Sequence, residues 1–132
     1  MTKLLVKTAL FFTALLSIMA FSFSVNAAPV PFSSVTYTWN EGAFAGGQYK
    51  LSFPDGKVKW IGLKVSEKGH TAVEDKVTIL NLGDDRYLIT WLEEVGYTVT
   101  EVLNIKSGTV KGVVSNQKEH YVLHGTIDEI KK

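Results

Sequence analysis

The chain has 132 residues, a formal net charge of +1 at pH 7 and no cysteine. This balanced charge offers no basic surface to gather phosphates, so the composition argues against nucleic-acid binding. Without disulfides the fold must be stabilised by packing alone, in a chain long enough for one modest domain.

The first residues have the pattern of a secretory signal peptide, which we assign to residues 1–27. Two lysines precede an apolar run at residues 9–23, and Val25 and Ala27 occupy the small-residue positions that a signal peptidase reads. We expect cleavage after Ala27 and a periplasmic or secreted protein. The apolar run is short for a membrane span, so no membrane anchor is expected after cleavage.

The remaining segment, residues 28–132, is expected to form one domain. It has 12 basic and 13 acidic residues, a formal net charge of −1. An exported domain without cysteine fits a bacterial periplasm better than a disulfide-rich extracellular module.

Apolar residues in this domain recur with period two, and no stretch keeps a helical period for three turns. The pattern predicts eight strands, near residues 34–39, 48–53, 57–63, 72–80, 86–93, 97–105, 109–116 and 120–129. Short breaks with turn residues, such as PDGK and LGDD, allow only antiparallel hairpins between neighbours. Closing such a meander removes both exposed edges. The sequence therefore predicts an all-β protein with a single antiparallel up-and-down barrel; an open sandwich is the alternative.

The alternation also predicts which side chains face the barrel interior. These include all three tryptophans and several tyrosines, among them Trp39, Tyr49, Trp60, Trp91 and Tyr97. Indole N–H and phenol groups need partners when buried, so a solid core would more often be aliphatic. Aromatic side chains with polar tips are typical of a semi-polar ligand cavity. The alternative is that they plug the ends of the barrel.

Two carboxylates, Asp75 and Glu101, also fall on the predicted inner face. Next to Asp75, the pattern places Val73 on the inner face and Glu74 on the outer face. A bulge within residues 73–77 would turn Asp75 outward. Glu101 lies in the middle of its strand, and a buried carboxylate either finds a donor or has its pKa raised. We expect Glu101 to face a wet or ligand-filled cavity; the alternative is a structural contact with a tyrosine.

These patterns favour a non-catalytic binding protein without a cofactor, which holds a small aromatic or amphipathic ligand inside the barrel. Glu101 would orient a polar or cationic group of that ligand. The predicted ligand contacts are Trp39, Tyr49, Trp60, Trp91, Tyr97 and Glu101.

No metal site is expected from the histidines. His120 and His124 would share a face of a helix, but on a strand that rises ~3.4 Å per residue they stand roughly 13 Å apart. The alternation places both of them on the outer face.

The order of elements resembles the MoaF-like family of calycin-type barrels. The matching segments are YTWNEGAFAGGQYKLSFPDGKVKW (37–60) and DDRYLITWLEEVGYTVTEVLNIKSGTVKGVV (84–114). The resemblance implies a lipocalin-like barrel in a family with many small exported proteins of unassigned activity. The family name comes from a protein linked to molybdenum-cofactor biosynthesis, and it does not imply that role for this chain.

One alternative function is a periplasmic protein–protein module, such as an inhibitor of a hydrolase. Such barrels present a loop to the active site of their target. The hairpin at residues 105–112 would then contact the partner, through Ser107 and Lys111.

A second alternative is a lyase or decarboxylase-like enzyme. Phenolic-acid decarboxylases are calycin-type barrels that use Tyr and Glu inside the barrel and an Arg for the substrate carboxylate. Tyr37, Tyr49, Glu101 and Arg86 would have to imitate that set. The sequence has no nucleophile motif and no phosphate-binding glycine loop in a strand–loop–helix context.

Overall fold

The computed structural model describes residues 30–132, so the predicted signal peptide and its cleavage site lie outside the described residues. One antiparallel sheet has the order β4-β3-β2-β1-β9-β8-β7-β6-β5. Its strands are β1 (Ser34–Glu41), β2 (Gln48–Ser52), β3 (Val58–Gly62), β4 (Thr71–Glu74), β5 (Val77–Gly83), β6 (Arg86–Leu92), β7 (Thr98–Asn104), β8 (Thr109–Ser115) and β9 (His120–Lys131). Two single-turn 3-10 helices are η2 (Pro54–Gly56) and η3 (Val65–Glu67). Within residues 30–132, no helix has the length and apolar character needed to span a membrane.

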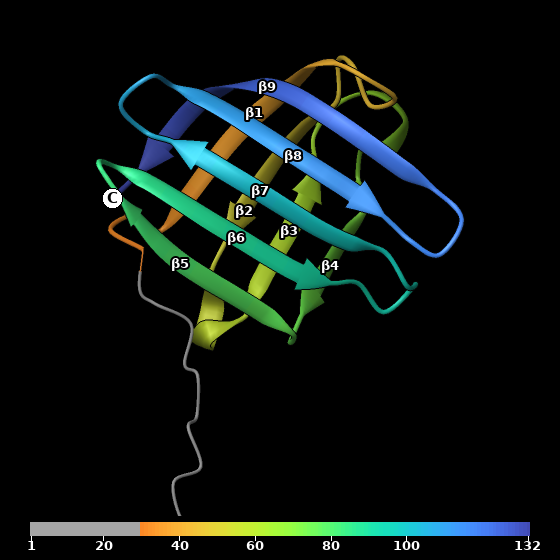
Figure 1. Cartoon of the computed structure of the whole chain (residues 1–132), viewed down its shortest axis with the longest axis horizontal. Coiled ribbons are helices and arrows are strands. Elements are labelled where there is room, and N and C mark those ends of the chain that lie inside the picture. Colours follow the sequence, from red (N-terminus) through yellow and green to blue (C-terminus); the bar gives the residue numbers. More distant parts are fainter. Residues whose placement is uncertain (1–29) are drawn as a thin grey trace, which may run out of the picture.

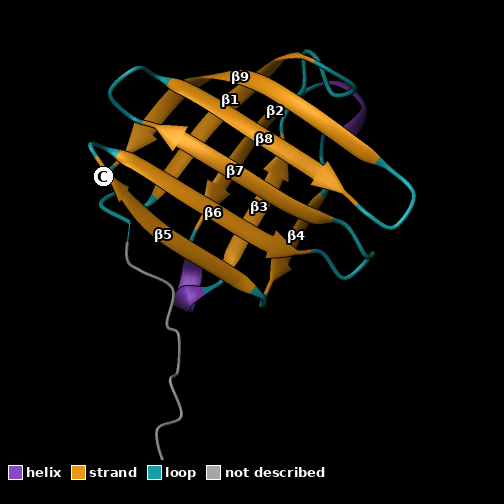
Figure 2. Ribbon diagram, viewed as in Figure 1, coloured by secondary structure: helices purple, strands orange, loops and turns teal. Residues whose placement is uncertain are grey.

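The sheet curls into a nearly closed barrel. Strands β5 to β9 form the front layer in Figures 1 and 2, and β1 to β4 lie behind them. Strands β1 and β9 join the two layers along an antiparallel ladder that runs from the pair Ser34–Lys131 to the pair Glu41–His124. The predicted all-β, antiparallel meander barrel is therefore confirmed.

The barrel has one open seam, at a place where the sequence pattern predicts a continuous strand. The segment 72–80 is two strands, β4 and β5, which form the two edges of the sheet. In the part of the chain that the structure describes, no ladder pairs β4 with β5. Asp75 and Lys76 carry the chain from one edge to the other, so nine strands replace the predicted eight.

The break at this seam changes which residues face inward. Val73, predicted inside, is 50% exposed, whereas Glu74, predicted outside, is only 7% exposed. Both predictions were wrong because the pairing with β3 sets the phase: Glu74 lies opposite Val58, which is fully buried. The two residues between the strands then shift the alternation before β5 begins. Asp75 does turn outward, at this break, and its carboxylate lies 3.1 Å from the Lys57 ammonium.

One part of the barrel interior is a filled aliphatic core. Its almost completely buried members are Val35, Leu51, Val58, Ile89, Leu103 and Val110. Phe32, just before β1, packs edge-on against Tyr87 with ring centroids 5.9 Å apart, and it also contacts Phe53.

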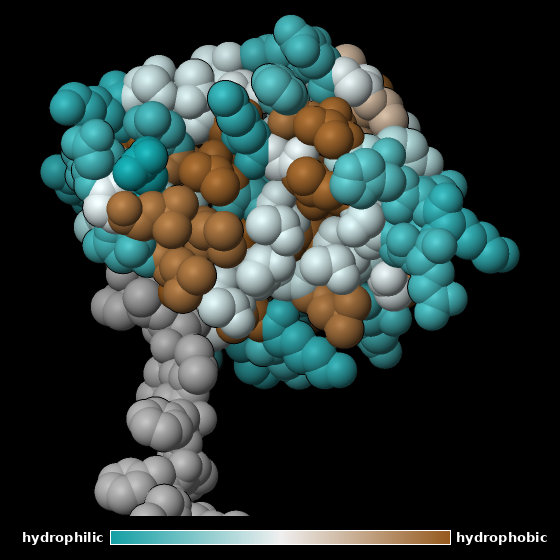
Figure 3. Space-filling model, viewed as in Figure 1, coloured by the Kyte–Doolittle hydropathy of each residue, from teal (hydrophilic) through white to brown (hydrophobic). Residues whose placement is uncertain are grey.

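The outer face of the front layer carries a cluster of apolar side chains among polar ones. Leu80 and Leu82 of β5 are among the exposed large hydrophobic residues, as are Leu92 of β6 and Val122 of β9. Leu80 lies opposite Leu88, and Leu88 lies opposite Val102, so apolar side chains are neighbours across β5, β6 and β7. Figure 3 shows several apolar side chains together on the left of this face, with others set apart by polar and neutral ones.

Two glycines make room for the indole of Trp39, where β1 closes the barrel. Gly125 pairs with Trp39 across the β1–β9 ladder, and Gly112 lies on the neighbouring strand β8. A Cβ at Gly125 would lie 2.4 Å from the Thr38 carbonyl oxygen and 2.9 Å from the Trp39 ring. A Cβ at Gly112 would lie 2.8 Å from the same ring. Glycine is needed at both positions because of this close approach.

We expect Gly125→Ala to destabilise the protein, because its methyl group would meet the backbone of β1. Overpacking of this kind costs about 1–3 kcal/mol, which lowers the melting temperature of a domain of this size by roughly 5–20 °C. Thermal unfolding followed by circular dichroism measures the change. Val122→Ala, on the exposed face of the same strand, is the control and should change stability by less than about 0.5 kcal/mol. Equal melting temperatures for the two variants would contradict this account of barrel closure.

Candidate ligand-binding cavity

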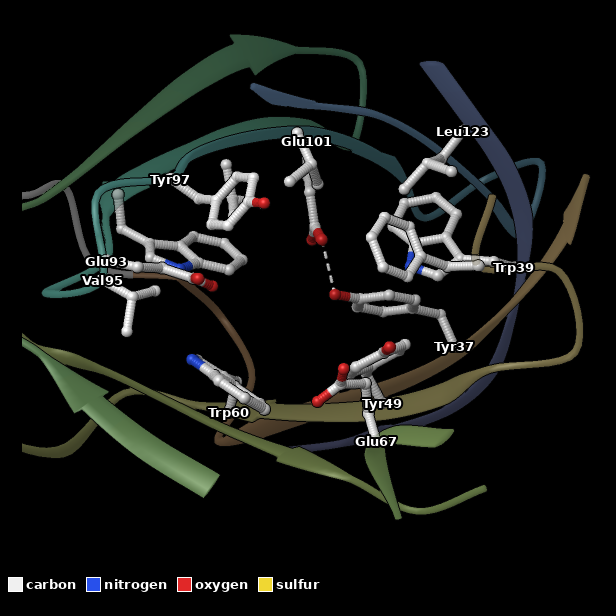
Figure 4. A pocket seen from close by; sticks show the side chains of 14 residues that line it. Tyr37, Trp39, Tyr49, Trp60, Glu67, Glu93, Val95, Tyr97, Glu101 and Leu123 are labelled. Carbon is white, nitrogen blue, oxygen red and sulfur yellow. Dashed lines mark hydrogen bonds between the residues drawn. The ribbon is translucent and has the colours of Figure 1, made fainter. Parts of the chain in front are cut away.

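The aromatic part of the interior contains a cavity of about 390 Å³. This volume lies within the range of about 300–1,000 Å³ that small-molecule sites occupy. Figure 4 shows its side chains pointing into a common space from the strands and loops around it. The lining residues are Tyr37, Trp39, Phe44, Tyr49, Trp60, Glu67, Trp91, Glu93, Val95, Tyr97, Val99, Glu101, Val114 and Leu123.

The six residues that the sequence pattern predicts as ligand contacts all line this one cavity. They come from six places in the fold: β1, β2, β3, the end of β6, the segment that leads into β7, and β7 itself. The residues are Trp39, Tyr49, Trp60, Trp91, Tyr97 and Glu101. Contact with a ligand stays a prediction for each of them.

Glu101 is held at the centre of the cavity wall by one hydrogen bond. The Tyr37 hydroxyl, from β1 on the opposite side of the barrel, donates to Glu101 Oε1 of β7 at 2.5 Å (Figure 4). Glu101 is only 2% exposed, and its second oxygen, Oε2, accepts no hydrogen bond from the described residues. Buried polar atoms are rarely left without a partner, so Oε2 is a strong candidate for contact with a ligand or water.

The surroundings of Glu101 favour its protonated form. Burial raises the pKa of the Glu101 carboxyl from 4.5 to about 8; the Tyr37 hydrogen bond opposes this rise and the charge of Glu93 adds to it. Burial, with the neighbouring Glu101 carboxylate, also raises the pKa of Tyr37 well above its usual value of 10. The pair is therefore neutral over most of the physiological pH range.

Two further carboxylates line the cavity from its rim. Glu93 follows β6, and Glu67 belongs to η3. Burial raises the pKa of Glu93, the Trp91 indole opposes this rise, and the charges of Glu74 and Glu67 add to it. Burial and the three cavity carboxylates together raise the pKa of Tyr49 to about 12. The cavity lining is thus acidic, with three glutamates and, among the described residues, no basic side chain.

Two indole N–H groups in the cavity wall also lack full partners. The Nε1 atoms of Trp60 and Trp91 are buried, and neither has a hydrogen bond of good geometry within the described residues. The Trp91 indole lies close enough to Glu93 to affect its pKa, without such a bond. In addition to the unpartnered Glu101 oxygen, the wall therefore has two hydrogen-bond donors, the indole N–H groups of Trp60 and Trp91.

The hydroxyl of Tyr97 forms a hydrogen bond with a residue that does not line the cavity. It donates to the carboxylate of Glu119, in the turn between β8 and β9. This bond lowers the pKa of Glu119 and raises that of Tyr97. Tyr97 therefore offers the cavity its ring, whereas Tyr37 is the tyrosine that donates to Glu101.

Sequence periodicity did not identify several lining residues, because they lie outside the regular strands. Phe44 belongs to the loop after β1, Glu67 to η3, and Glu93 and Val95 to the loop after β6. A loop has no period from which the direction of a side chain can be predicted. Glu93 differs, because it ends the predicted strand at residues 86–93, two positions after Trp91, and the same alternation places it on the inner face. It was not among the predicted ligand contacts.

The residues of the alternative protein-contact hairpin lie on the outside of the barrel. Ser107 is exposed in the turn after β7, where its N–H donates to Asn104 Oδ1 at 3.0 Å and its hydroxyl lies 2.7 Å from that of Thr109. Lys111 is exposed on β8. Contact of either residue with a protein partner stays a prediction.

The structure does not assemble the set that a decarboxylase-like site needs. Tyr37, Tyr49 and Glu101 line the cavity, whereas Arg86 is exposed at the start of β6 and its Nε donates to the Gly83 carbonyl at 3.3 Å. The cavity wall therefore lacks the cation that would hold a substrate carboxylate.

None of the three histidines is among the residues that line the cavity, although His70 contacts Glu67 at its rim. His120 and His124 are exposed on β9, as the alternation predicts, and the Nδ1 atom of His70 lies 2.8 Å from the Glu67 carboxylate. Among residues 30–132, no group of three or more His, Cys, Asp and Glu side chains is arranged to hold a metal ion.

A nearly closed antiparallel meander around an aromatic cavity defines a lipocalin-like β-barrel. The sequence model of the MoaF-like family matches residues 41–128, and the chain belongs to this family. A protein from Burkholderia vietnamiensis described as a presumed beta-lactamase has a similar crystal structure, with a TM-score of 0.65, 17% identity, and coverage of 77% of this chain and 96% of that one. Likeness at this identity shows the fold alone. No curated protein matches this chain.

We expect the stability of the protein to depend on the pH through Glu101. A pKa raised from 4.5 to about 8 means that the folded state holds its proton more tightly than the unfolded chain. This stabilisation is complete below pH 4.5, is lost as the pH rises toward 8, and is constant above that. Glu101→Gln should lack the loss, so its free energy of unfolding relative to the original chain should rise by up to about 4 kcal/mol between pH 5 and 9.

Urea unfolding across this pH range measures the difference. Glu129→Gln, which removes an exposed carboxylate of β9, is the matched control and should show a constant difference. A constant difference for Glu101→Gln as well would contradict the burial of an uncompensated carboxyl group.

Proposed function

We propose that this protein is an exported, non-catalytic binding protein that holds a small aromatic or amphipathic ligand inside the barrel. The observation that carries this proposal is the free, buried Oε2 of Glu101 in an aromatic cavity of about 390 Å³. A domain that fills one part of its interior with aliphatic side chains has no packing reason to leave the other part hollow and polar.

The ring arrangement supports a flat, partly apolar ligand. Tyr37 stacks on Tyr49 with centroids 6.2 Å apart, and Tyr49 tilts toward Trp60 at 6.4 Å. Together they form a continuous aromatic wall from β1 to β3. Apolar contact with such walls can give micromolar affinity, about 8 kcal/mol, without any catalytic group.

Two observations favour binding over turnover and over protein inhibition. The only arginine of the chain, Arg86, lies on the outer surface, away from the cavity carboxylates. The Ser107 turn is already bonded to its own neighbours, and no feature of that hairpin marks it as an interface. Export to the periplasm or outside the cell is supported by the signal-peptide pattern of residues 1–27.

We expect the neutral fluorophore N-phenyl-1-naphthylamine to bind the protein with one site, and a side chain that fills the cavity to prevent this. Val114 lines the cavity, whereas its neighbour Val113 lies on the opposite face of β8 and pairs with the exposed Val122. Val114→Trp should weaken binding at least tenfold, because the indole would occupy the ligand volume. Val113→Trp is the matched control and should change it less than about twofold.

Fluorescence titration measures both affinities, and far-ultraviolet circular dichroism shows that both variants are folded. Unchanged binding to folded Val114→Trp would place the fluorophore elsewhere and contradict an interior site. Native mass spectrometry of the gently purified original chain should in addition show a co-purifying small molecule that is absent from Val114→Trp.

A further inference from the structure

The cavity wall is acidic as well as aromatic. Glu67, Glu93 and Glu101 line it, and no lysine, arginine or histidine does so in the described part of the chain. Glu67 contacts the His70 ring at 2.8 Å, but no basic side chain of the described residues faces Glu93 or Glu101, an arrangement that is unfavourable for their ionised forms when the cavity is empty. A cationic ligand would relieve it.

We propose that the ligand is a small organic cation, an aromatic amine or quaternary ammonium, whose positive charge lies between Glu101 Oε2 and the aromatic wall. This inference rests on the proposed function and adds the charge of the ligand to it. The observation that points to a ligand, rather than only to an acidic cluster, is the unpartnered Oε2 on a side chain that is 98% buried and aimed into the cavity (Figure 4).

The rings around Glu101 suit a cation better than a neutral group. Tyr37 and Trp39 meet at a centroid distance of 5.0 Å, and Tyr37 continues through Tyr49 to Trp60. The face of each ring carries partial negative charge, so an ammonium group held against several rings and one carboxylate is attracted by all of them. The apolar body of an aromatic amine would pack against the remaining wall.

The titratable groups that face Glu101 from other elements leave its carboxyl free to lose its proton when a cation binds. Tyr37 of β1 donates to Oε1, and Tyr49 of β2 keeps its proton because its pKa is raised to about 12. Tyr97 is bonded to Glu119. Glu93 adds negative charge from the loop after β6; Glu67 of η3 does so from the rim, where His70 contacts it.

Binding of a cation is therefore coupled to release of a proton. In the empty cavity the pKa of Glu101 is about 8, so the carboxyl is protonated at neutral pH. A bound cation favours the ionised form and lowers that pKa, so the two binding equilibria are linked. The affinity should rise close to tenfold per pH unit between about pH 6 and 8, and level off above the pKa of the free carboxyl. A neutral ligand that accepts a hydrogen bond from protonated Glu101 would show the opposite trend.

Three probes of similar shape separate these possibilities: benzyltrimethylammonium, its neutral isostere neopentylbenzene, and the anion phenylacetate. Displacement of N-phenyl-1-naphthylamine gives the affinities at pH 6 to 9. Calorimetry in phosphate and in Tris, which differ in ionisation enthalpy, gives the protons released. We expect the cation to bind at least tenfold more tightly than the isostere at pH 8.5, and to release about one proton at pH 6.5.

Glu101→Gln keeps the shape of the side chain and removes its charge. In this variant the cation should lose at least tenfold in affinity at pH 8.5, and both the pH dependence and the proton release should disappear. The isostere should bind as before. Glu129→Gln, with the same change in net charge on the outer surface, should leave all three probes within about twofold.

The outcomes distinguish this inference from the proposed function on which it rests. Displacement by the isostere or by phenylacetate as strong as that by the cation, or no displacement by the cation, would overturn the charge assignment while leaving an interior site in place. Fluorophore binding that survives Val114→Trp would overturn both. Cation binding without proton release would overturn the role given to Glu101.

Discussion

The hydrogen bond from Tyr37 to Glu101 is the interaction on which the site depends. It connects β1 with β7 across the barrel interior and joins residues 64 positions apart in the chain. Tyr37 binds one carboxyl oxygen and leaves the other, Oε2, buried in the cavity wall without a partner among the described residues. An aliphatic pair at these positions would cost less to bury, since each polar group gives up hydration to enter the interior. The cost of burying this pair supports the binding role that we propose.

The barrel can carry this unfavourable group because its interior is divided. The aliphatic core, which includes Leu51, Ile89 and Leu103, is completely buried, whereas the aromatic part surrounds the cavity. Trp39 lies at the β1–β9 closure, where the absence of side chains at Gly112 and Gly125 gives its ring room. Because the rings are large and rigid, they can surround an empty space that flexible aliphatic chains would collapse into.

Period-two alternation was sufficient to predict the barrel and much of the cavity wall. In β6 and β7 each strand is long and paired on both sides, so Trp91, Val99 and Glu101 face inward as the pattern indicates. Glu67 was not predicted, because it lies in the 3-10 turn η3, which has no period of two; Glu93 ends the predicted strand 86–93 in phase with Trp91, and the alternation does place it inward. Val73 and Glu74 were assigned to the wrong faces, because the strand was taken to continue through a break that only the pairing with β3 reveals.

The same break helps to position the site. Because the alternation shifts at Asp75 and Lys76, Glu74 is buried, and its carboxylate accepts a hydrogen bond from the Glu94 N–H at 3.3 Å. On the other side of the seam the Leu92 N–H donates to the Lys76 carbonyl at 3.1 Å. These two bonds hold both neighbours of Glu93, the carboxylate that raises the pKa of Glu101. The open seam, which leaves two strand edges unpaired, therefore supplies two hydrogen bonds that anchor the β6–β7 loop, and Glu93 in that loop contributes to the acidity of the cavity.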